Sequence, residues 1–264
     1  MVDPVVLRDL AEVAAREAGA LLLAGLDDVR TNVRTKSTGT DLVSEMDHAA
    51  ERCIVDRLLG TRPDDGLLGE EGTDILGTSG VRWVIDPLDG TTNYLYGLAG
   101  FGVSIAAEHD GAVVAGAVLD VVRGELFAAS LGGGATRDGR AIAPSAATEL
   151  PLALLATGFS YDAAQRARQA TVLTEVLPRV RDIRRFGAAA LDLCAVACGR
   201  VDGYYERGLA PWDLAAGGLI ATESGAVLTA FEGGPARAGS VVAAAPGIAG
   251  DLLGLLLAAG AADA

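Results

Sequence analysis

Helix-like and strand-like segments alternate along most of this chain, and that alternation restricts its possible folds more than any other feature of the sequence. Apolar residues recur at helical spacing over residues 5–26 and 45–59, and short apolar runs typical of strands follow at 66–69 and 81–85. Over residues 101–129 the pattern predicts several strands separated by glycine-containing turns. Alternating helices and strands with an antiparallel middle indicate an α/β (α+β) protein built in layers.

The second half of the chain continues the alternation. Helices are predicted over residues 163–177, 188–198 and 212–224, and strands over 182–186 and 203–206, before two last strands and a final helix. No repeat, low-complexity tail or proline-rich linker interrupts the pattern. We therefore expect one domain with two approximate halves that meet near two prolines; the corresponding ranges are 1–264 for the domain, 1–145 and 146–264 for the halves, and 144–151 for the boundary.

Two glycine-containing segments are assigned to loops. Residues 31–40 are polar, and we expect a loop or hairpin there that is mobile without metal. The run Gly132-Gly133-Gly134 lacks the spacing of a nucleotide-binding fingerprint and predicts a tight hairpin turn instead.

The net charge of −14 argues against binding nucleic acid or an anionic membrane through a basic surface. A phosphorylated substrate is still compatible with this charge, because a bound metal ion can reverse the field inside one cleft. The acidic N-terminus is unlike a signal sequence, and the longest apolar run, 252–262, is too short to cross a bilayer. Three cysteines, an odd number, favour reduced thiols and a cytoplasmic location.

The sharpest motif runs from Trp83 to Asn93, where an apolar strand ends at Asp86, turns at Pro87 and reaches Asp89. Two carboxylates three residues apart at a strand end can converge on one cation or bridge two, and a helix opening after Gly90 would direct free N–H groups at a phosphate. Asp-Pro and Asp-Gly are also ordinary turn formers, so this motif does not decide the matter by itself.

Further acidic residues could contribute to the same site as Asp86 and Asp89. Glu70-Glu71 ends an apolar strand just upstream, Asp213 lies where a helix begins, and Asp41 and Asp47 flank the start of another helix. Each could be a helix cap or a solvated acid. Jointly they supply the oxygen ligands that suit Mg²⁺, whereas two histidines in the whole chain disfavour a histidine-rich metal site.

Three blocks of this sequence resemble the signature blocks of the inositol monophosphatase family. They are Glu70-Glu71, the run Asp86-Pro87-Leu88-Asp89-Gly90-Thr91 and the run Trp212-Asp213-Leu214-Ala215-Ala216-Gly217. Their order and spacing agree with the family, and the similarity extends from about residue 36 to the C-terminal helix. The resemblance implies a layered αβαβα sandwich, a magnesium-dependent phosphatase inhibited by lithium, and a homodimer.

The resemblance also implies a site with two to three Mg²⁺ ions. Glu70, Asp86 and the Leu88 carbonyl would hold the first ion. Asp86, Asp89 and Asp213 would hold the second, with Asp86 bridging, and Glu70 with water would hold a weaker third. Asp47 and the Thr91 hydroxyl, together with Glu70, would form the catalytic set that orients and deprotonates the attacking water.

The substrate side follows from the same resemblance. Backbone N–H groups of Gly90 and Thr91 would bind the phosphate. The positions that match the alcohol-binding set of the family, beside the shared ligand Asp213, are Asn93, Gly187, Ala189 and Glu206. Inositol 1-phosphate is the substrate favoured by Glu206 and by the chain length.

This sequence departs from the family pattern at a few positions. Ser44 replaces a threonine and keeps the hydroxyl, and Leu88 replaces an isoleucine without altering the carbonyl. Ala188 replaces a substrate-side threonine, and Asn93 replaces a frequent aspartate. The last two changes leave sister substrates open: histidinol phosphate, a 3′-phosphoadenosine nucleotide or fructose 1,6-bisphosphate.

Two other phosphatase classes share single features with this sequence. Haloacid-dehalogenase phosphatases carry their two aspartates two positions apart, whereas Asp86 and Asp89 are three apart with Pro87 between them. Cys194 and Arg200 match the Cys-x5-Arg spacing of cysteine phosphatases, but the cysteine falls in a predicted helix, where a buried thiol is expected. A non-catalytic interaction protein on the same fold is the alternative of a different class.

Overall fold

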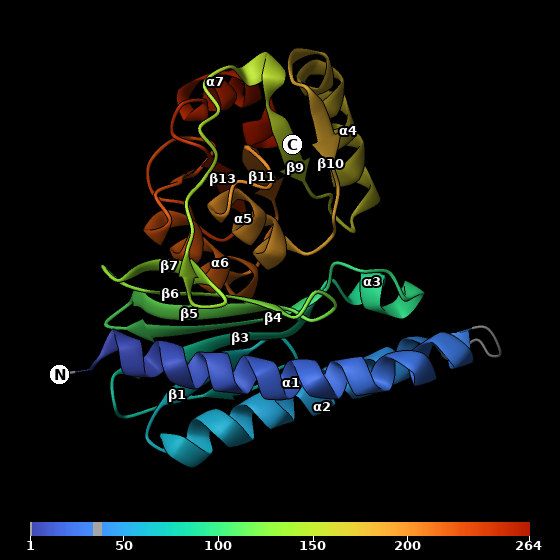
Figure 1. Ribbon diagram of the computed structural model, residues 1–264. Coiled ribbons are helices and arrows are strands. Elements are labelled where there is room, and N and C mark those ends of the chain that lie inside the picture. Colours follow the sequence, from blue (N-terminus) through green and yellow to red (C-terminus); the bar gives the residue numbers. More distant parts are fainter. Residues whose placement is uncertain (1, 34–38) are drawn as a thin grey trace.

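Two β-sheets and seven α-helices stack in five alternating layers in the part of the chain that the structure describes (Figure 1). The structure is a computed structural model that describes the backbone of residues 2–33 and 39–264 and the side chains of residues 2–26 and 45–264. From bottom to top in Figure 1, the layers are a helix pair, a large sheet, a second helix pair, a smaller sheet and an outer helix pair. The layered αβαβα prediction is confirmed.

The larger sheet has the order β2-β1-β3-β4-β5-β6-β7-β8. Its strands β1 and β3 are parallel, and the remaining neighbours pair antiparallel. The strand bounds are Gly66–Gly69, Asp74–Ile75, Val81–Asp89, Gly102–His109, Ala112–Asp120, Glu125–Ser130, Gly134–Arg137 and Arg140–Ala141 for β1 to β8. Gly133 N donates to Ser130 O at 2.8 Å between β6 and β7, so the predicted glycine hairpin turn is confirmed.

Helices α1 (Pro4–Val33) and α2 (Gly39–Thr61) cover one face of this sheet. Their apolar faces and the facing strand residues form one buried cluster, which includes Leu22, Ile54 and Trp83. The short helix α3 (Thr91–Tyr96) follows β3 and lies at the end of α1 (Figure 1).

The smaller sheet has the order β10-β9-β11-β13-β12. Its strands are Leu154–Thr157, Asp182–Arg184, Gly203–Arg207, Val227–Thr229 and Ser240–Ala244 for β9 to β13. Helices α5 (Ala189–Ala197) and α6 (Pro211–Glu223) lie between the two sheets, and α4 (Ala163–Val176) and α7 (Ala249–Ala258) cover the outer face. The buried cluster around α5 and α6 takes residues from both sheets, for example Val118 and Val241.

The first two helices and strand β3 extend further than predicted, and strand β9 was not predicted from the sequence. Helix α1 continues to Val33 and α2 already begins at Gly39, so the loop predicted over 31–40 was too long; residues 34–38 of that prediction lie outside the described residues. Strand β3 does not end at Asp86 but continues through Pro87 to Asp89.

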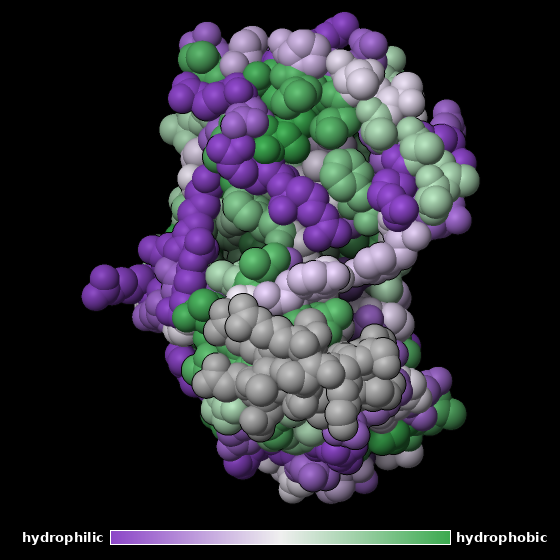
Figure 2. Space-filling model, turned by 90° about the vertical axis from the view of Figure 1, so that its right-hand side faces the viewer, coloured by the Kyte–Doolittle hydropathy of each residue, from purple (hydrophilic) through white to green (hydrophobic). Residues whose placement is uncertain are grey.

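Hydrophilic and hydrophobic residues are intermixed among the described residues on the face shown in Figure 2. Among the described helices, none combines the length and apolar composition that a membrane span requires.

Candidate active site

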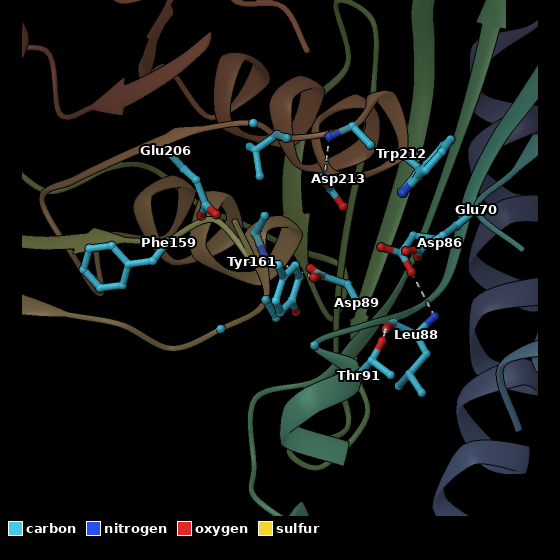
Figure 3. Close-up of a pocket in the computed structure, with 18 of the residues that line it drawn as sticks. Glu70, Asp86, Leu88, Asp89, Thr91, Phe159, Tyr161, Glu206, Trp212 and Asp213 are labelled. Carbon is cyan, nitrogen blue, oxygen red and sulfur yellow. Dashed lines mark hydrogen bonds between the residues drawn. The ribbon is translucent and has the colours of Figure 1, made fainter. Parts of the chain in front are cut away.

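Three carboxylates from two distant segments converge between the sheets (Figure 3). Asp86 and Asp89 come from the end of β3 and Asp213 from the first turn of α6, and one oxygen of each lies within 4.8 Å of the others. A hydrogen bond joins the side chains of Glu70 and Asp86. The pairing of β1 with β3 explains that contact: Gly69 lies opposite Ile85 in parallel strands, so the next residue of each strand reaches the same edge.

A bulge in β3 shapes this edge. Asp86 pairs with Ser104 and Asp89 with Gly102, so two residues of β3, Pro87 and Leu88, lie opposite one residue of β4. Pro87 has no N–H group to donate to the neighbouring strand, so it fits at this irregular position of the sheet. The Leu88 backbone lies at the cavity, whereas its side chain is buried in the core. The Leu88 N–H donates to Asp86 Oδ1 at 2.9 Å, and its carbonyl accepts from the Thr91 hydroxyl at 3.1 Å.

Backbone N–H groups at the starts of two helices hold the other two carboxylates. Ala189 N and Ala190 N, in the first turn of α5, donate to Asp89 at 3.2 and 2.7 Å. Ala210 N donates to Asp213 Oδ2 at 2.7 Å, just before α6. These contacts fix both side chains and favour their charged forms.

Burial and mutual repulsion act in the opposite direction. Burial, then the charges of Asp89, Glu70 and Asp213, raise the pKa of Asp86 well above its ordinary value. Burial and Asp213 raise the pKa of Asp89 to about 8. A cluster of carboxylates that resist ionisation together is stabilised by a cation among them, and an all-oxygen donor set suits Mg²⁺. The described residues therefore fit a divalent metal ion.

Asp47 lies on α2 beside the Glu70-Glu71 turn. Its side chain is buried, and its Oδ1 has no hydrogen-bond partner among the described residues. Burial and the charges of Glu71, Glu70 and Glu51 raise the pKa of Asp47 to about 8. Glu51 also fixes the turn itself, since it accepts from the N–H of Glu71 at 3.0 Å.

A cavity of about 210 Å³ opens beside the carboxylates. Its lining includes most of the site residues predicted from the sequence: Glu70, Asp86, Leu88, Asp89, Gly90, Thr91, Gly187, Ala189, Glu206 and Asp213. Figure 3 shows Glu206 on the side of the cavity opposite Glu70 and Asp86. The Tyr204 hydroxyl donates to Glu206 Oε2 at 2.7 Å, and burial raises the pKa of Glu206 to about 7.

Asp47 and Asn93 are predicted site residues that do not line this cavity. Asn93 is 7% exposed, and its amide donates to the carbonyls of Gly100 at 2.6 Å and Phe186 at 2.7 Å. The amide that replaces a carboxylate at this position thus joins two backbone segments behind the cavity.

Several lining residues were not predicted from the sequence. Gly158, Phe159 and Tyr161 belong to the loop between β9 and α4, and Arg185 follows β10. Arg185 follows Arg184 directly, and the sequence does not show which of the two arginines faces the cavity. The aromatic loop carries no pattern that separates it from other surface loops.

The cysteine phosphatase alternative is not supported by the fold. Cys194 lies inside α5 and is fully buried, and burial raises the pKa of its thiol well above the ordinary value. A buried, protonated thiol in a helix cannot act as the nucleophile of a phosphate-binding loop.

Comparison with known proteins decides the family. The model of the family described as "Inositol monophosphatase family" matches residues 3–260. The chain belongs to the inositol monophosphatase family. This places it among phosphoric monoester hydrolases that use metal ions, and the acidic cluster described above is a fitting place for them.

Relatives and solved structures in this family resemble the chain over nearly its whole length. An inositol-1-monophosphatase of Mycobacterium leprae is 46% identical, with 96% of this chain and 94% of the relative aligned. A protein of Vibrio cholerae named Nus factor SuhB is 40% identical over 90% of this chain and 91% of the relative. The structure of Mycobacterium tuberculosis SuhB superposes with a TM-score of 0.87 at 42% identity, covering 100% of both chains.

Proposed function

We propose that this member of the inositol monophosphatase family hydrolyses inositol 1-phosphate to inositol and phosphate with Mg²⁺ as cofactor. The observation that carries the proposal is the convergence of Asp86, Asp89 and Asp213, with Glu70 bonded to Asp86, at one end of a cavity whose other side presents Glu206. Glu70, Asp86, the Leu88 carbonyl, Asp89 and Asp213 would hold two to three magnesium ions. When bound, such ions activate water and stabilise developing charge on phosphate oxygens.

The protein's own groups have separate tasks in this mechanism. Asp47 accepts a proton from the attacking water, because its carboxylate is buried near Glu70 with an unpartnered oxygen. The Thr91 hydroxyl orients that water, and the N–H groups of Gly90 and Thr91 donate to the phosphate. Displacement at phosphorus then breaks the P–O bond to the leaving oxygen, which takes a proton from solvent water and departs as the alcohol. The hydroxyls of that alcohol contact Glu206 and the backbone at Gly187 and Ala189.

The alcohol half of the substrate is the less constrained part of the proposal. Two family positions differ here: Ala188 has no hydroxyl, and the Asn93 amide contacts backbone carbonyls rather than the cavity. Histidinol phosphate, a 3′-phosphoadenosine nucleotide and fructose 1,6-bisphosphate are therefore the sister substrates to compare.

Phosphate release with Mg²⁺ from inositol 1-phosphate, histidinol phosphate, 3′,5′-adenosine bisphosphate and fructose 1,6-bisphosphate tests the proposal, with Asp89→Asn run beside the wild type. Turnover that favours inositol 1-phosphate and is abolished in the variant supports both chemistry and substrate. Preference for another ester keeps the mechanism and changes the substrate. No release from any ester, by folded protein with Mg²⁺ present, contradicts the proposal.

A binding role beside catalysis is a second candidate function, because relatives at 40% identity carry the name Nus factor SuhB. The homodimer also belongs to the proposal. Its support is a group of exposed apolar side chains on and near α3, namely Tyr96, Leu98 and Phe186, and sedimentation of the purified protein tests it. A cytoplasmic location stays a prediction from the cysteine count.

A further inference from the structure

Arg185 is the one basic residue among the described residues that line the cavity, which also presents five carboxylates. The residue follows β10 and is exposed, and the described residues offer it no hydrogen bond or ion pair. Its neighbour Arg184 behaves differently, since it pairs with Asp182 at 2.6 Å and does not line the cavity. In a chain with a net charge of −14, an arginine beside an acidic cavity without a protein partner is available for a ligand.

Gly187 gives the Arg185 side chain room to lie at the cavity wall. A Cβ atom at Gly187 would lie 2.3 Å from Arg185 Nη1 and 3.1 Å from the Asn93 amide nitrogen. The guanidinium and the amide therefore both lie next to the space that a side chain at position 187 would occupy. The backbone φ of Gly187, 96°, also favours glycine at this position.

Glu206 lies within electrostatic reach of Arg185. The positive charge of Arg185 lowers the pKa of Glu206 against the larger effect of burial, yet the two side chains form no ion pair within 4.0 Å. The Tyr204 hydroxyl holds one oxygen of Glu206, and the described residues donate no other hydrogen bond to that carboxylate. A fixed acceptor and an unpaired donor thus face the same part of the cavity without contacting each other.

We propose that Arg185 is a specificity-determining residue, which donates a hydrogen bond to a hydroxyl oxygen of the leaving alcohol while Glu206 accepts the hydrogen of that hydroxyl or of its neighbour. A hydroxyl is both donor and acceptor, so a polyol satisfies both side chains at once. A second phosphate on the alcohol satisfies Arg185 but is repelled by the carboxylate of Glu206 on the same side of the cavity. The inference deepens the proposed function and rests on it.

The test compares Arg185→Gln and Arg185→Lys with the wild type on three esters with Mg²⁺. Inositol 1-phosphate and glycerol 2-phosphate carry alcohol hydroxyls, whereas phenyl phosphate carries none. Loss of a hydrogen bond from a charged donor is expected to raise KM for the two polyol esters about tenfold or more in Arg185→Gln, with kcat changed less. Arg185→Lys should recover part of the loss, and kinetics with phenyl phosphate should stay within about twofold of the wild type.

Arg184→Gln is the matched control, because it removes an adjacent exposed arginine that does not line the cavity; its kinetics should equal those of the wild type. Glu206→Gln and the double variant complete a cycle. If both side chains bind the same alcohol, the combined loss is smaller than the product of the single losses.

Three results would overturn the inference. Equal losses with polyol esters and phenyl phosphate would show that Arg185 acts on the phosphate. Unchanged kinetics with all three esters would show an arginine without a role in binding. Fructose 1,6-bisphosphate is assayed as a fourth ester, and a greater loss with it than with inositol 1-phosphate would show that Arg185 recognises a second phosphate. If the wild type turns over glycerol 2-phosphate but not inositol 1-phosphate, the proposed substrate fails, and the comparison of glycerol 2-phosphate with phenyl phosphate still decides the role of Arg185.

Discussion

At the scale of single residues, the position of Asp47 separates its chemical role from its effect on folding. The carboxyl group is buried near Glu70, Glu71 and Glu51, and all three acids disfavour its ionisation. An amide of the same shape carries no charge and can donate as well as accept hydrogen bonds. The two side chains therefore differ in proton transfer and in repulsion, but little in packing.

Asp47→Asn should accordingly lower kcat by about 100- to 10,000-fold, the range expected for loss of a general base. The metal-free variant should unfold at a higher temperature than the metal-free wild type at pH 8, because one repulsive charge is gone. Phosphate release and thermal denaturation measure the two effects. A variant with wild-type kcat would remove Asp47 from the proposed catalytic set.

The raised pKa values of Asp47 and Asp89, each about 8 against an ordinary 3.8, predict the pH dependence of the metal-free protein. Between these values the folded state holds protons that the unfolded chain has released, so the free energy of unfolding falls as pH rises from about 4 to 8. Below pH 4 this contribution is fully present. Mg²⁺ binds the ionised carboxylates and should raise Tm more at pH 8 than at pH 5, as thermal denaturation with Mg²⁺ or EDTA can show. An equal effect at both pH values would contradict this account.

At the scale of elements, the junction between β3 and α3 depends on Gly90. Its φ is 91°, and a Cβ atom there would lie 2.8 Å from Gly100 O, a backbone atom that cannot move aside cheaply. Gly225, after α6, has a similar φ of 95° but nothing within 4 Å of such an atom. The two glycines share a positive φ, which would strain any other residue, and they differ in contact.

Gly225→Ala should lower the free energy of unfolding by about 1–2 kcal/mol through backbone strain. Gly90→Ala should cost about 1–3 kcal/mol more, because the added methyl group overpacks the junction. It should also lower kcat, since the phosphate-binding N–H groups shift. Urea titration and phosphate release measure both; equal losses of stability would show that contact at Gly90 is unimportant.

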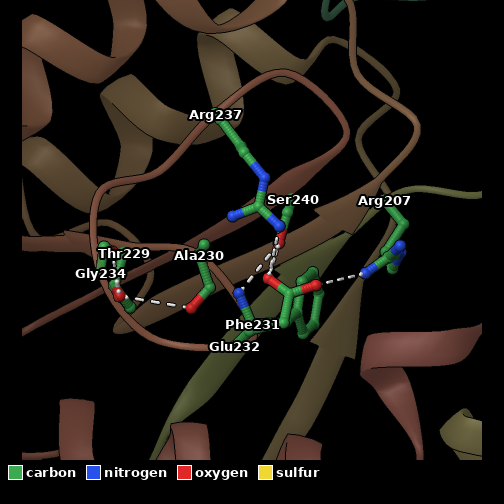
Figure 4. Close-up of polar contacts among 8 residues, drawn as sticks. All are labelled: Arg207, Thr229, Ala230, Phe231, Glu232, Gly234, Arg237 and Ser240. Atoms are coloured by element: carbon green, nitrogen blue, oxygen red, sulfur yellow. Dashed lines mark hydrogen bonds and ion pairs between the residues drawn. The ribbon is translucent and has the colours of Figure 1, made fainter.

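A second element, the loop between β12 and β13, is tied to the strand that carries Glu206 (Figure 4). Glu232 accepts from Arg207 at 3.3 Å, from Arg237 at 2.9 Å and from the Ser240 hydroxyl at 3.0 Å. Its own backbone N–H, Ser240 and Arg237 lower the pKa of Glu232 to about 2. The loop is thereby joined to Arg207, the residue that follows Glu206.

Glu232→Gln should be less stable than the wild type at pH 7, and the difference should shrink as pH falls from about 4.5 towards 2. The sign follows from the lowered pKa: the stabilisation is present above the unfolded value of 4.5 and is lost on protonation of the folded state near pH 2. Urea midpoints between pH 7 and pH 3 measure it. Because the interaction is exposed, salt should weaken it as well.

Elements of this fold were more predictable from sequence than the contacts between them. Apolar periodicity located α4, α5, α6 and the strands β1, β10 and β11 to within a few residues, since burial of one face imposes that period, whereas β9 was not predicted. The continuation of β3 through Pro87 was missed, because a bulge is stabilised by its partner strand. The proposed metal ligands came from motif resemblance. Arg185 lines the cavity and Asn93 does not, and both facts depend on side-chain direction, which no one-dimensional pattern records.

At the scale of the whole molecule, the central helix layer belongs to both sheets. The buried cluster around α5 and α6 includes Val84 and Val118 from the larger sheet and Val241 from the smaller one. If either sheet separated from this layer, it would lose its own apolar contacts with α5 and α6 and would expose a cluster that the other sheet shares. The two halves should therefore unfold together.

Trp83 in β3 and Trp212 in α6 give one fluorescent probe in each half of the chain. The single-tryptophan variants Trp212→Phe and Trp83→Phe should each show one urea transition, whose midpoint by fluorescence equals that by circular dichroism of the same variant. Fluorescence and circular dichroism transitions that separate would instead indicate that the halves unfold in sequence.

The convergence of Asp89 and Asp213 on one site also has a mechanical meaning. These residues are 124 positions apart (213 − 89), one at the end of β3 and the other in the first turn of α6. A cation shared by such distant ligands works as a reversible cross-link, which restricts the unfolded chain as a disulfide does, by about 4–5 kcal/mol for a loop of this length in the chain-entropy model. If the chain were cut in the connection after β8, within residues 142–149, magnesium would still hold the two pieces together. A chelator would then release them.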